Sequence, residues 1–359
     1  MNILFISNYK DIQSGWAEAA KSYIRAIATI PNVDLAIRPV YMGQHNPQTD
    51  ADLLEYEYNQ LASYDAVIQK VLPHLFVYDK KYGQNIGLSV FETYNIQNNW
   101  SDRCRLMDKL MTPAWGINPF PLLPFKRYNI SQPVNLDQFN KQYEPLTKSD
   151  DFIFYFIGEN ITRKNWLDIV TAFYTEFAPE EPVQLIIKTS QAGLNSAQVN
   201  QIVDEKITRL KQRLRLYWDD SFYKKVIIIT EYLSEENLRR LHCTGNCFIM
   251  PSYGEAFCRP LVEAMGFGNH VLATDNTAMK HFVPNDSLID STMTIVDCKD
   301  PPLADLYTGN EYWSKPNLLD LRFKMREMFN KGKQKRQYDM SKFSYEYVGQ
   351  QILKAIEDK

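Results

Sequence analysis

The chain has 359 residues, a length that favours two domains over a single hydrophobic core. Its composition, 45% hydrophobic and 23% charged, is ordinary for a soluble globular protein. The formal net charge of -3 excludes a global attraction to nucleic acid or anionic membrane, although it leaves local basic patches open.

The N-terminus and the cysteines bear on the compartment. Residues 1–7 have no basic n-region, and their apolar run is too short for a signal peptide. No run reaches the roughly 18 apolar residues that span a bilayer. The five cysteines are scattered and odd in number, which favours reduced thiols: Cys104, Cys243, Cys247, Cys258 and Cys298. The sequence therefore predicts a cytoplasmic protein with no transmembrane segment.

The first half opens with a strand, a glycine-containing loop and a helix. Residues 3–6 predict a buried parallel strand, and Gly15 starts a helix with apolar residues at helical spacing. This order is typical of a nucleotide-binding half. A single glycine leaves two interpretations of Gly15 open, a plain turn or a ligand contact. Further strands are predicted at 33–40, 66–71, 75–78, 88–91 and 110–113, and helices around 53–61 and 99–109.

Glu92 follows the strand predicted at 88–91. Ligands of open α/β sheets bind beyond the carboxyl ends of the strands, which makes Glu92 a candidate site residue. The alternative is a solvated loop carboxylate. A polar, proline-containing stretch between 132 and 151 predicts the interdomain linker.

The second half repeats the pattern. Residues 152–157 predict a strand that Gly158 ends, and Arg163 and Lys164 precede an amphipathic helix. Cations at a helix start oppose the helix dipole, so they indicate a bound anion; a solvated pair is the alternative. Strands are also predicted at 183–188, 226–230, 247–250, 271–274 and 293–296, with a helix capped by Ser234 and a last helix over 344–357.

Residues 251–268 read PSYGEAFCRPLVEAMGFG and predict a loop that opens a short helix. The first amides of a helix lack partners and attract anions. Glu255 and Glu263 would repel a bare phosphate, but a sugar nucleotide offers hydroxyl groups as well as phosphate. Two α/β halves, each with such a loop, predict a ligand-binding cleft.

These motifs resemble those of the retaining glycosyltransferases of GT-B fold, family-4-like (glycosyl transferases group 1). Residues 251–268 are similar to the family's PSxxEGFGxPxxEAMxxG, and the likeness is strongest over 153–275. The resemblance implies two Rossmann-like doubly wound domains that face each other across a cleft. It places an acceptor-side domain at 1–140 with a crossover helix at about 340–359, and a donor domain at 141–339.

The resemblance also implies roles for the candidate residues. Glu255 would bind hydroxyls of the donor sugar, Glu263 the ribose, and Arg163 and Lys164 the diphosphate, with Glu92 on the acceptor side. Glycines and backbone amides would complete the donor site: Gly15, Gly158, Ala256, Phe257, Cys258 and Arg259.

Two departures from the family pattern bear on these roles. The usual Glu-Gly-Phe-Gly is Glu255 to Cys258 here, so Ala256 and Cys258 can serve only if neither position requires a positive φ. The usual Gly-Arg-Leu begins at Gly158 and lacks its arginine, which Arg163 can replace.

The implied activity is a retaining hexosyl- or pentosyltransferase that uses a UDP- or GDP-sugar and requires no metal or other cofactor. A nucleotide-sugar-binding protein of the same fold without activity is the alternative; a phosphorylase would need a cofactor lysine in a recognisable setting, which is not found. The acceptor hydroxyl is open: a glycan, a lipid-linked saccharide or a modified nucleobase in DNA. The basic stretch 206–215 and the basic tail are candidates to approach DNA or an anionic membrane, although an exposed helix face is the favoured interpretation.

Overall fold

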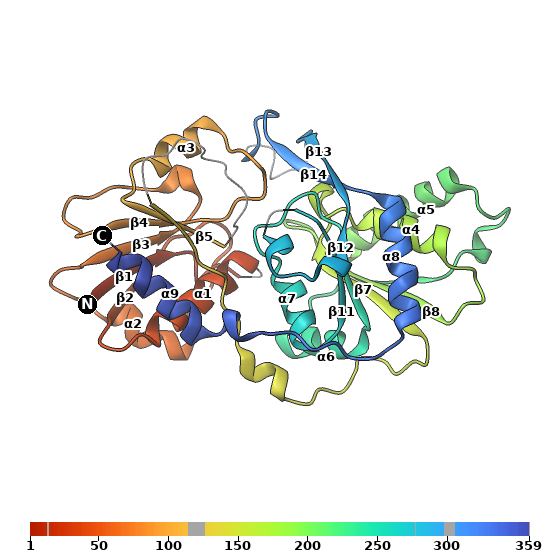
Figure 1. Cartoon of the computed structure of the whole chain (residues 1–359), viewed down its shortest axis with the longest axis horizontal. Helices are drawn as coiled ribbons and strands as arrows, with labels where there is room; N and C mark the ends of the chain where they lie inside the picture. Colours follow the sequence, from red (N-terminus) through yellow and green to blue (C-terminus); the bar gives the residue numbers. More distant parts are fainter. Residues whose placement is uncertain (13, 114–125, 277, 298–305, 359) are drawn as a thin grey trace. The chain divides into compact units, whose positions relative to one another are not determined.

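The computed structural model describes residues 1–12, 14–113, 126–276, 278–297 and 306–358 (Figure 1). These residues form two compact units, Met1–Gln138 with Asp339–Lys359, and Phe139–Tyr338. Cys298, counted above among the reduced thiols, lies outside the described residues. Each unit contains a parallel six-stranded sheet with helices packed on it, so the predicted α/β class with two doubly wound domains is confirmed.

Unit 1 is built on the sheet order β2-β1-β3-β4-β5-β6, and all of these strands run parallel. Its elements are β1 (Asn2–Ser7), α1 (Gly15–Ala28), β2 (Asp34–Pro39), α2 (Leu54–Tyr58), β3 (Ala66–Lys70), β4 (Asn85–Leu88), α3 (Asn98–Cys104), β5 (Lys109–Thr112), β6 (Lys126–Asn129) and α9 (Tyr345–Glu357). The strand order reverses between β1 and β3, so the loops after these two strands diverge and leave room for a ligand.

The last helix belongs to unit 1, where α9 lies beside α1 (Figure 1). Val348 and Ile352 share a hydrophobic core with Ile3 and Ile24. The ammonium of Lys109 donates to the carbonyls of Ala355, Ile356 and Asp358 at 3.0, 2.8 and 2.6 Å, which satisfies the last turn of α9.

Unit 2 has the sheet order β12-β11-β10-β7-β8-β9. Its elements are β7 (Phe152–Glu159), α4 (Trp166–Glu176), β8 (Val183–Ser190), α5 (Ser196–Leu214), β9 (Val226–Ile229), α6 (Glu235–Thr244), β10 (Cys247–Met250), α7 (Arg259–Gly266), β11 (His270–Thr274), β12 (Leu288–Ile289), β13 (Ser291–Ile295), β14 (Tyr312–Pro316) and α8 (Leu318–Lys331). Here the order reverses between β7 and β10, so the loops after these two strands diverge.

Several predicted elements of unit 1 differ from the structure. The strand predicted at 75–78 is absent, because residues Pro73–Leu75 form a 3-10 turn and Val77 and Tyr78 are exposed. The strand predicted at 88–91 is β4, which begins at Asn85 and ends at Leu88. The helix predicted at 99–109 ends at Cys104, since Lys109 already begins β5. Apolar runs alone therefore misplaced the strands that contain polar residues.

In unit 2, the strand predicted at 293–296 is β13, which pairs antiparallel with β14 outside the parallel sheet. Gly158 does not end its strand. β7 continues to Glu159, and Gly158 pairs with Thr189 of β8. The prediction that Ser234 caps a helix is confirmed, because its side chain accepts from the Asn237 amide at the start of α6.

Candidate functional site

The loops that diverge at the strand reversal of unit 2 bring two cations and a carboxylate together. Arg163 and Lys164 follow β7, and Glu255 follows β10. The Glu255 carboxylate accepts from the Arg163 guanidinium at 2.9 Å and from the Lys164 ammonium at 2.5 Å. One carboxylate and two cations leave a net positive charge at the place where this sheet topology positions ligands.

Glu255 is ionised in this cluster although it is only 4% exposed. Burial raises the pKa of its carboxyl group, but the charges of Lys164 and Arg163 outweigh burial and hold the pKa below its ordinary value. A buried carboxylate that keeps its charge is a strong acceptor for hydrogen bonds from hydroxyl groups.

Arg163 and Lys164 differ in their hydrogen-bond partners and in their exposure. The Arg163 guanidinium also donates to the Gly254 carbonyl at 2.6 Å, and the Arg163 carbonyl accepts from the Tyr253 amide at 2.8 Å. Arg163 therefore ties the loop after β7 to the loop after β10. The Lys164 side chain is more accessible, with 15% of its surface exposed against 7% for Arg163.

The two cations precede α4 and do not lie in its first turn. They belong to the 3-10 turn Thr162–Lys164, and Asn165 adopts a left-handed conformation, φ 53°, before α4 begins. The Asn165 side-chain amide donates to Asp168 at 2.9 Å and to the Pro251 carbonyl at 3.1 Å. The helix dipole is therefore a weaker argument for an anion than the sequence suggested, and the cluster with Glu255 is a stronger one.

The segment from Ala256 to Arg259 leads from Glu255 into α7. Ala256, Phe257 and Cys258 are buried, and Cys258 has φ 66°, in the left-handed region. The condition that neither Ala256 nor Cys258 requires positive φ therefore fails at Cys258, where the family's glycine would be unstrained. Ala256 has no positive φ.

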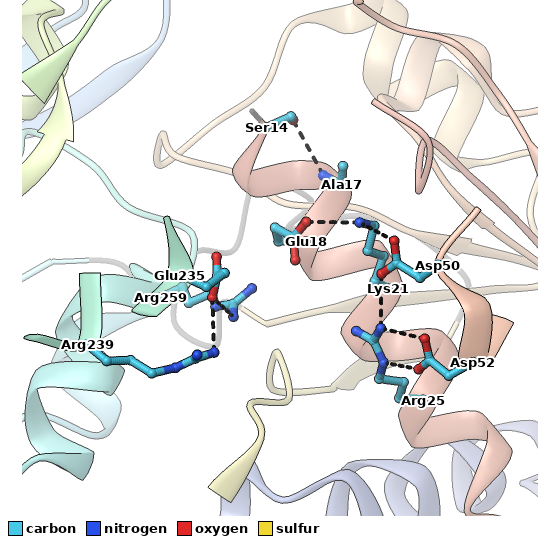
Figure 2. Close-up of polar contacts among 10 residues, drawn as sticks. All are labelled: Ser14, Ala17, Glu18, Lys21, Arg25, Asp50, Asp52, Glu235, Arg239 and Arg259. Carbon is cyan, nitrogen blue, oxygen red and sulfur yellow. Dashed lines mark hydrogen bonds and ion pairs between the residues drawn. The ribbon is translucent and has the colours of Figure 1, made fainter. Parts of the chain in front are cut away.

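Glu263 lies on α7 and is held by Arg259. The Arg259 guanidinium donates to the Glu263 carboxylate at 2.8 Å, and His242 lies 3.6 Å from the same group. Burial raises the pKa of Glu263, but the interactions with Arg259 and His242 outweigh burial and lower the pKa to about 2. Arg259 and Arg239 also reach Glu235, at 4.0 and 3.3 Å (Figure 2).

The two glycines of the candidate set differ. A Cβ on Gly158 would lie 2.6 Å from the Phe156 ring, so packing within unit 2 already explains this glycine. Gly15 is the first residue of α1, and a Cβ there would have no atom within 4 Å. The fold of unit 1 therefore does not require glycine at this position, and the space beside its Cα is open.

Unit 1 carries Glu92, the expected acceptor-side residue, and Ser14, which the sequence analysis did not single out. Ser14 caps α1 by accepting from the Ala17 amide at 3.4 Å (Figure 2). Glu92 is half-buried in the loop between β4 and α3. The sequence analysis missed Lys70, the last residue of β3, which is 2% exposed beside α1. The available signal was a lysine at the end of an apolar strand.

Residues 137–302 match the family model described as Glycosyl transferases group 1. The match covers most of unit 2 and includes the cluster of Arg163, Lys164 and Glu255. No curated protein matches the sequence.

Solved structures resemble the whole chain. They include the lipopolysaccharide outer core galactosyltransferase WaaB, with TM-score 0.66, 14% identity and 99% of each chain covered. An Escherichia coli trehalose-6-phosphate structure bound with UDP-2-fluoro glucose has TM-score 0.60, 9% identity, and 100% and 99% of the chains covered. Sucrose-phosphate synthase from Thermosynechococcus elongatus has TM-score 0.57, 14% identity, and 99% and 94% covered.

The chain therefore has the GT-B fold, and the family match supports a group 1 glycosyltransferase. At these identities the structural likeness concerns the fold. No helix of the described residues is both long and apolar enough to cross a membrane. Nor do those residues contain a group of three or more His, Cys, Asp or Glu side chains that could hold a metal ion.

Proposed function

We propose that the protein transfers a sugar from a nucleotide-diphosphate sugar to an acceptor hydroxyl, with retention of the anomeric configuration and without a metal. The observation that carries the proposal is the cluster of Arg163, Lys164 and Glu255, which lies at the strand reversal of unit 2 inside the family match. Its net positive charge suits a diphosphate, and its buried carboxylate suits sugar hydroxyls.

The main electrostatic task in such a transfer is the departure of the diphosphate. As the bond from the anomeric carbon to the diphosphate oxygen breaks, its electron pair leaves with the oxygen and negative charge develops there. Lys164, the more accessible cation, would stabilise that charge, and Arg163 would hold Lys164 and Glu255 in place. Because these side chains supply the positive charge, the proposal needs no metal.

Glu255 and Glu263 take different parts in the proposal. Glu255 would accept hydrogen bonds from hydroxyls of the donor sugar, and Glu263 from the ribose. Both carboxylates are ionised at neutral pH because neighbouring cations lower their pKa values. The backbone amides at the start of α7, from Ala256 to Arg259, would contact the diphosphate.

The donor and the acceptor are proposed only as classes. The donor is a UDP- or GDP-sugar carrying a hexose or pentose. The acceptor is a hydroxyl of a glycan, a lipid-linked saccharide or a modified nucleobase. Glu92 would make polar contacts with this acceptor. Retention is supported by the resemblance of residues 251–268 to the retaining family.

A panel of UDP-, GDP- and ADP-sugars tests the proposal. A ligand at about 100 times its Kd adds about 2.7 kcal/mol to the free energy of unfolding, so the correct donor should raise Tm clearly. That donor should then release free nucleotide in the presence of an acceptor, or slowly in water. Binding without release on any acceptor would indicate a binding protein, and no binding to any sugar nucleotide would contradict the proposal.

A further inference from the structure

Next to Glu263, unit 2 contains a row of buried polar side chains, Asn269, Tyr155 and His242, to which the proposed function gives no role. Asn269 and His242 are 1% exposed, and Tyr155 is fully buried. They come from the segment between α7 and β11, from β7 and from α6. The Tyr155 hydroxyl lies 2.8 Å from Nδ1 of His242, and Nε2 of His242 lies 3.6 Å from Oε2 of Glu263. The row therefore ends at the carboxylate that the proposal assigns to the ribose.

The orientation of the Asn269 amide is fixed by two groups whose hydrogen-bonding roles cannot change. Its nitrogen donates to the backbone carbonyl of His242 at 2.7 Å, and a carbonyl can only accept. Its oxygen accepts from the ammonium of Lys335 at 2.6 Å, and an ammonium can only donate. The second N–H of the amide therefore points at the Tyr155 hydroxyl oxygen, 2.7 Å away.

This orientation determines where the protons of Tyr155 and His242 lie. The Tyr155 oxygen accepts from Asn269, so its own O–H must donate elsewhere. Burial holds the pKa of Tyr155 well above its ordinary value, so the hydroxyl keeps its proton. In the described part of the chain, this hydroxyl meets no acceptor except Nδ1 of His242. Nδ1 therefore accepts, and the ring N–H is on Nε2, the nitrogen that faces Glu263.

The His242 ring is held in this position by its packing as well as by Tyr155. It stacks on the Phe267 ring, with centroids 5.6 Å apart and an interplanar angle of 15°. Its Nε2 is buried and has no partner within hydrogen-bond distance among the described residues. Oε2 of Glu263 is the acceptor that this N–H faces, and a small movement of the carboxylate would turn the contact into a hydrogen bond.

Glu263 thus has a donor beside each of its carboxylate oxygens. Arg259 donates to Oε1 at 2.8 Å, and the His242 N–H faces Oε2. An ionised carboxylate offers about four acceptor positions, two on each oxygen. One position therefore remains on each oxygen, and the Glu263 side chain is 13% exposed, which makes it accessible to a ligand. Two such positions suit the two neighbouring hydroxyls of a ribose.

We propose that His242 is a positioning residue for the nucleotide, whose Nε2–H fixes Oε2 of Glu263 so that the carboxylate accepts from both the 2′- and the 3′-hydroxyl of the ribose. Tyr155 and Asn269 act through His242 by keeping the proton on Nε2. The inference rests on the proposed function, in which Glu263 contacts the ribose. It predicts that the row controls the preference for ribose hydroxyls and leaves the contacts with the diphosphate unchanged.

The preference for ribose hydroxyls can be measured directly. Calorimetry should give the Kd values of UDP and 2′,3′-dideoxy-UDP, or of the corresponding guanosine pair. Hydrogen bonds to a charged carboxylate are strong, so wild type should bind the ribonucleotide at least about tenfold more tightly. His242→Phe keeps a ring but lacks the N–H, and should reduce this preference to about threefold or less. His242→Gln can still donate from its amide and should retain most of the preference.

Tyr155→Phe is a milder variant, because it removes one oxygen and leaves the His242 ring in place. Without the tyrosine hydroxyl the ring proton is no longer confined to Nε2, so the ribose preference should fall about threefold. Tyr23→Phe in unit 1 is the matched control: Tyr23 is 1% exposed, and its hydroxyl donates to the Ile130 carbonyl at 3.1 Å. Both variants should lose a similar amount of Tm, but Tyr23→Phe should keep the full preference. If His242→Phe fails to fold, Tyr155→Phe decides the question.

The outcomes separate this inference from the proposed function. A full ribose preference in a folded His242→Phe, or an equal loss of preference in Tyr23→Phe and Tyr155→Phe, would overturn the inference and leave the proposed function standing. Equal losses in His242→Gln and His242→Phe would also overturn it, because the ring and not its N–H would then matter. If wild type bound both nucleotides equally well, Glu263 would not contact the ribose and the inference would fail. Failure to bind any nucleoside diphosphate would overturn the proposed function as well.

Discussion

The strand reversals of the two units use the same topology with different electrostatics. In unit 2, Arg163 and Lys164 share the Glu255 carboxylate, so one of the two positive charges is neutralised and the cluster keeps a net positive charge. In unit 1, Lys70 is buried against a carbonyl and an indole ring, with no ion-pair partner among the described residues. The backbone thus forms a reversal of strand order in each unit. The reversal in unit 2 holds a paired, positively charged cluster, and the reversal in unit 1 holds a single cation, Lys70, whose pKa is lowered.

Acid should unfold the protein partly through Glu263, the largest effect expected in unit 2. Its folded pKa of about 2 lies below the unfolded value of 4.5, so its contribution is present above pH 4.5 and is lost as pH falls toward 2. The difference corresponds to about 3 kcal/mol at most. Denaturant unfolding at pH 7 and pH 3 should show a smaller acid loss in Glu263→Gln than in wild type. Glu236→Gln, at an exposed glutamate of α6, should behave as wild type.

Lys164→Met tests the paired cluster itself. Loss of one charge contact to the leaving diphosphate should lower turnover about 100-fold. Stability should change little, because Lys164 is the more accessible cation and Arg163 still neutralises Glu255. The measurement is nucleotide release at saturating donor, with the exposed Lys225→Met as control. Full activity in Lys164→Met would place the site elsewhere.

The two glycines sharpen the comparison between the units. Gly158→Ala would force a Cβ against the Phe156 ring and should destabilise the fold by about 1–3 kcal/mol. Gly15→Ala meets no atom within 4 Å and should leave the free energy of unfolding unchanged or slightly higher. Chemical denaturation of both variants measures this difference. A Gly15→Ala variant as destabilised as Gly158→Ala would contradict it.

The smallest expected effect concerns Cys258, whose φ of 66° is strained for any residue with a Cβ. Cys258→Gly relieves the strain but removes a buried thiol, whereas Cys258→Ala removes the thiol and keeps the strain. The glycine variant should therefore exceed the alanine variant by about 1 kcal/mol in free energy of unfolding. Equal stabilities would show that the left-handed conformation costs nothing here.

The sequence predicted most of the fold because buried parallel strands are apolar runs, as in 152–157 and 247–250. It failed where a strand contains polar residues, as β4 does at Asn85, and where exposed residues happen to be apolar, as at Val77. Periodicity also carries no information about strand partners, so it did not reveal that β13 pairs antiparallel with β14 outside the parallel sheet.

The candidate residues of unit 2 were found because they lie in sequence motifs, but the contacts between them could not be. Glu255 lies about 90 residues after Arg163 and Lys164 in the sequence, and only the order of the strands in the sheet brings these side chains into contact. Only the glycine that the family has at the position of Cys258 raised the question of a positive φ there, because the cysteine itself gives no sign of it. Lys70 was missed because it belongs to no motif, and its significance lies in its burial.

The most direct test of the central claim, that the cluster in unit 2 holds a diphosphate, compares a nucleoside diphosphate with the monophosphate of the same base. Calorimetry should measure the Kd values of UDP and UMP, or of GDP and GMP, for the wild-type protein and for Lys164→Met. The account predicts that wild type binds the diphosphate at least about tenfold more tightly and that Lys164→Met removes most of this preference. An undiminished preference in Lys164→Met, or no preference in wild type, would contradict it.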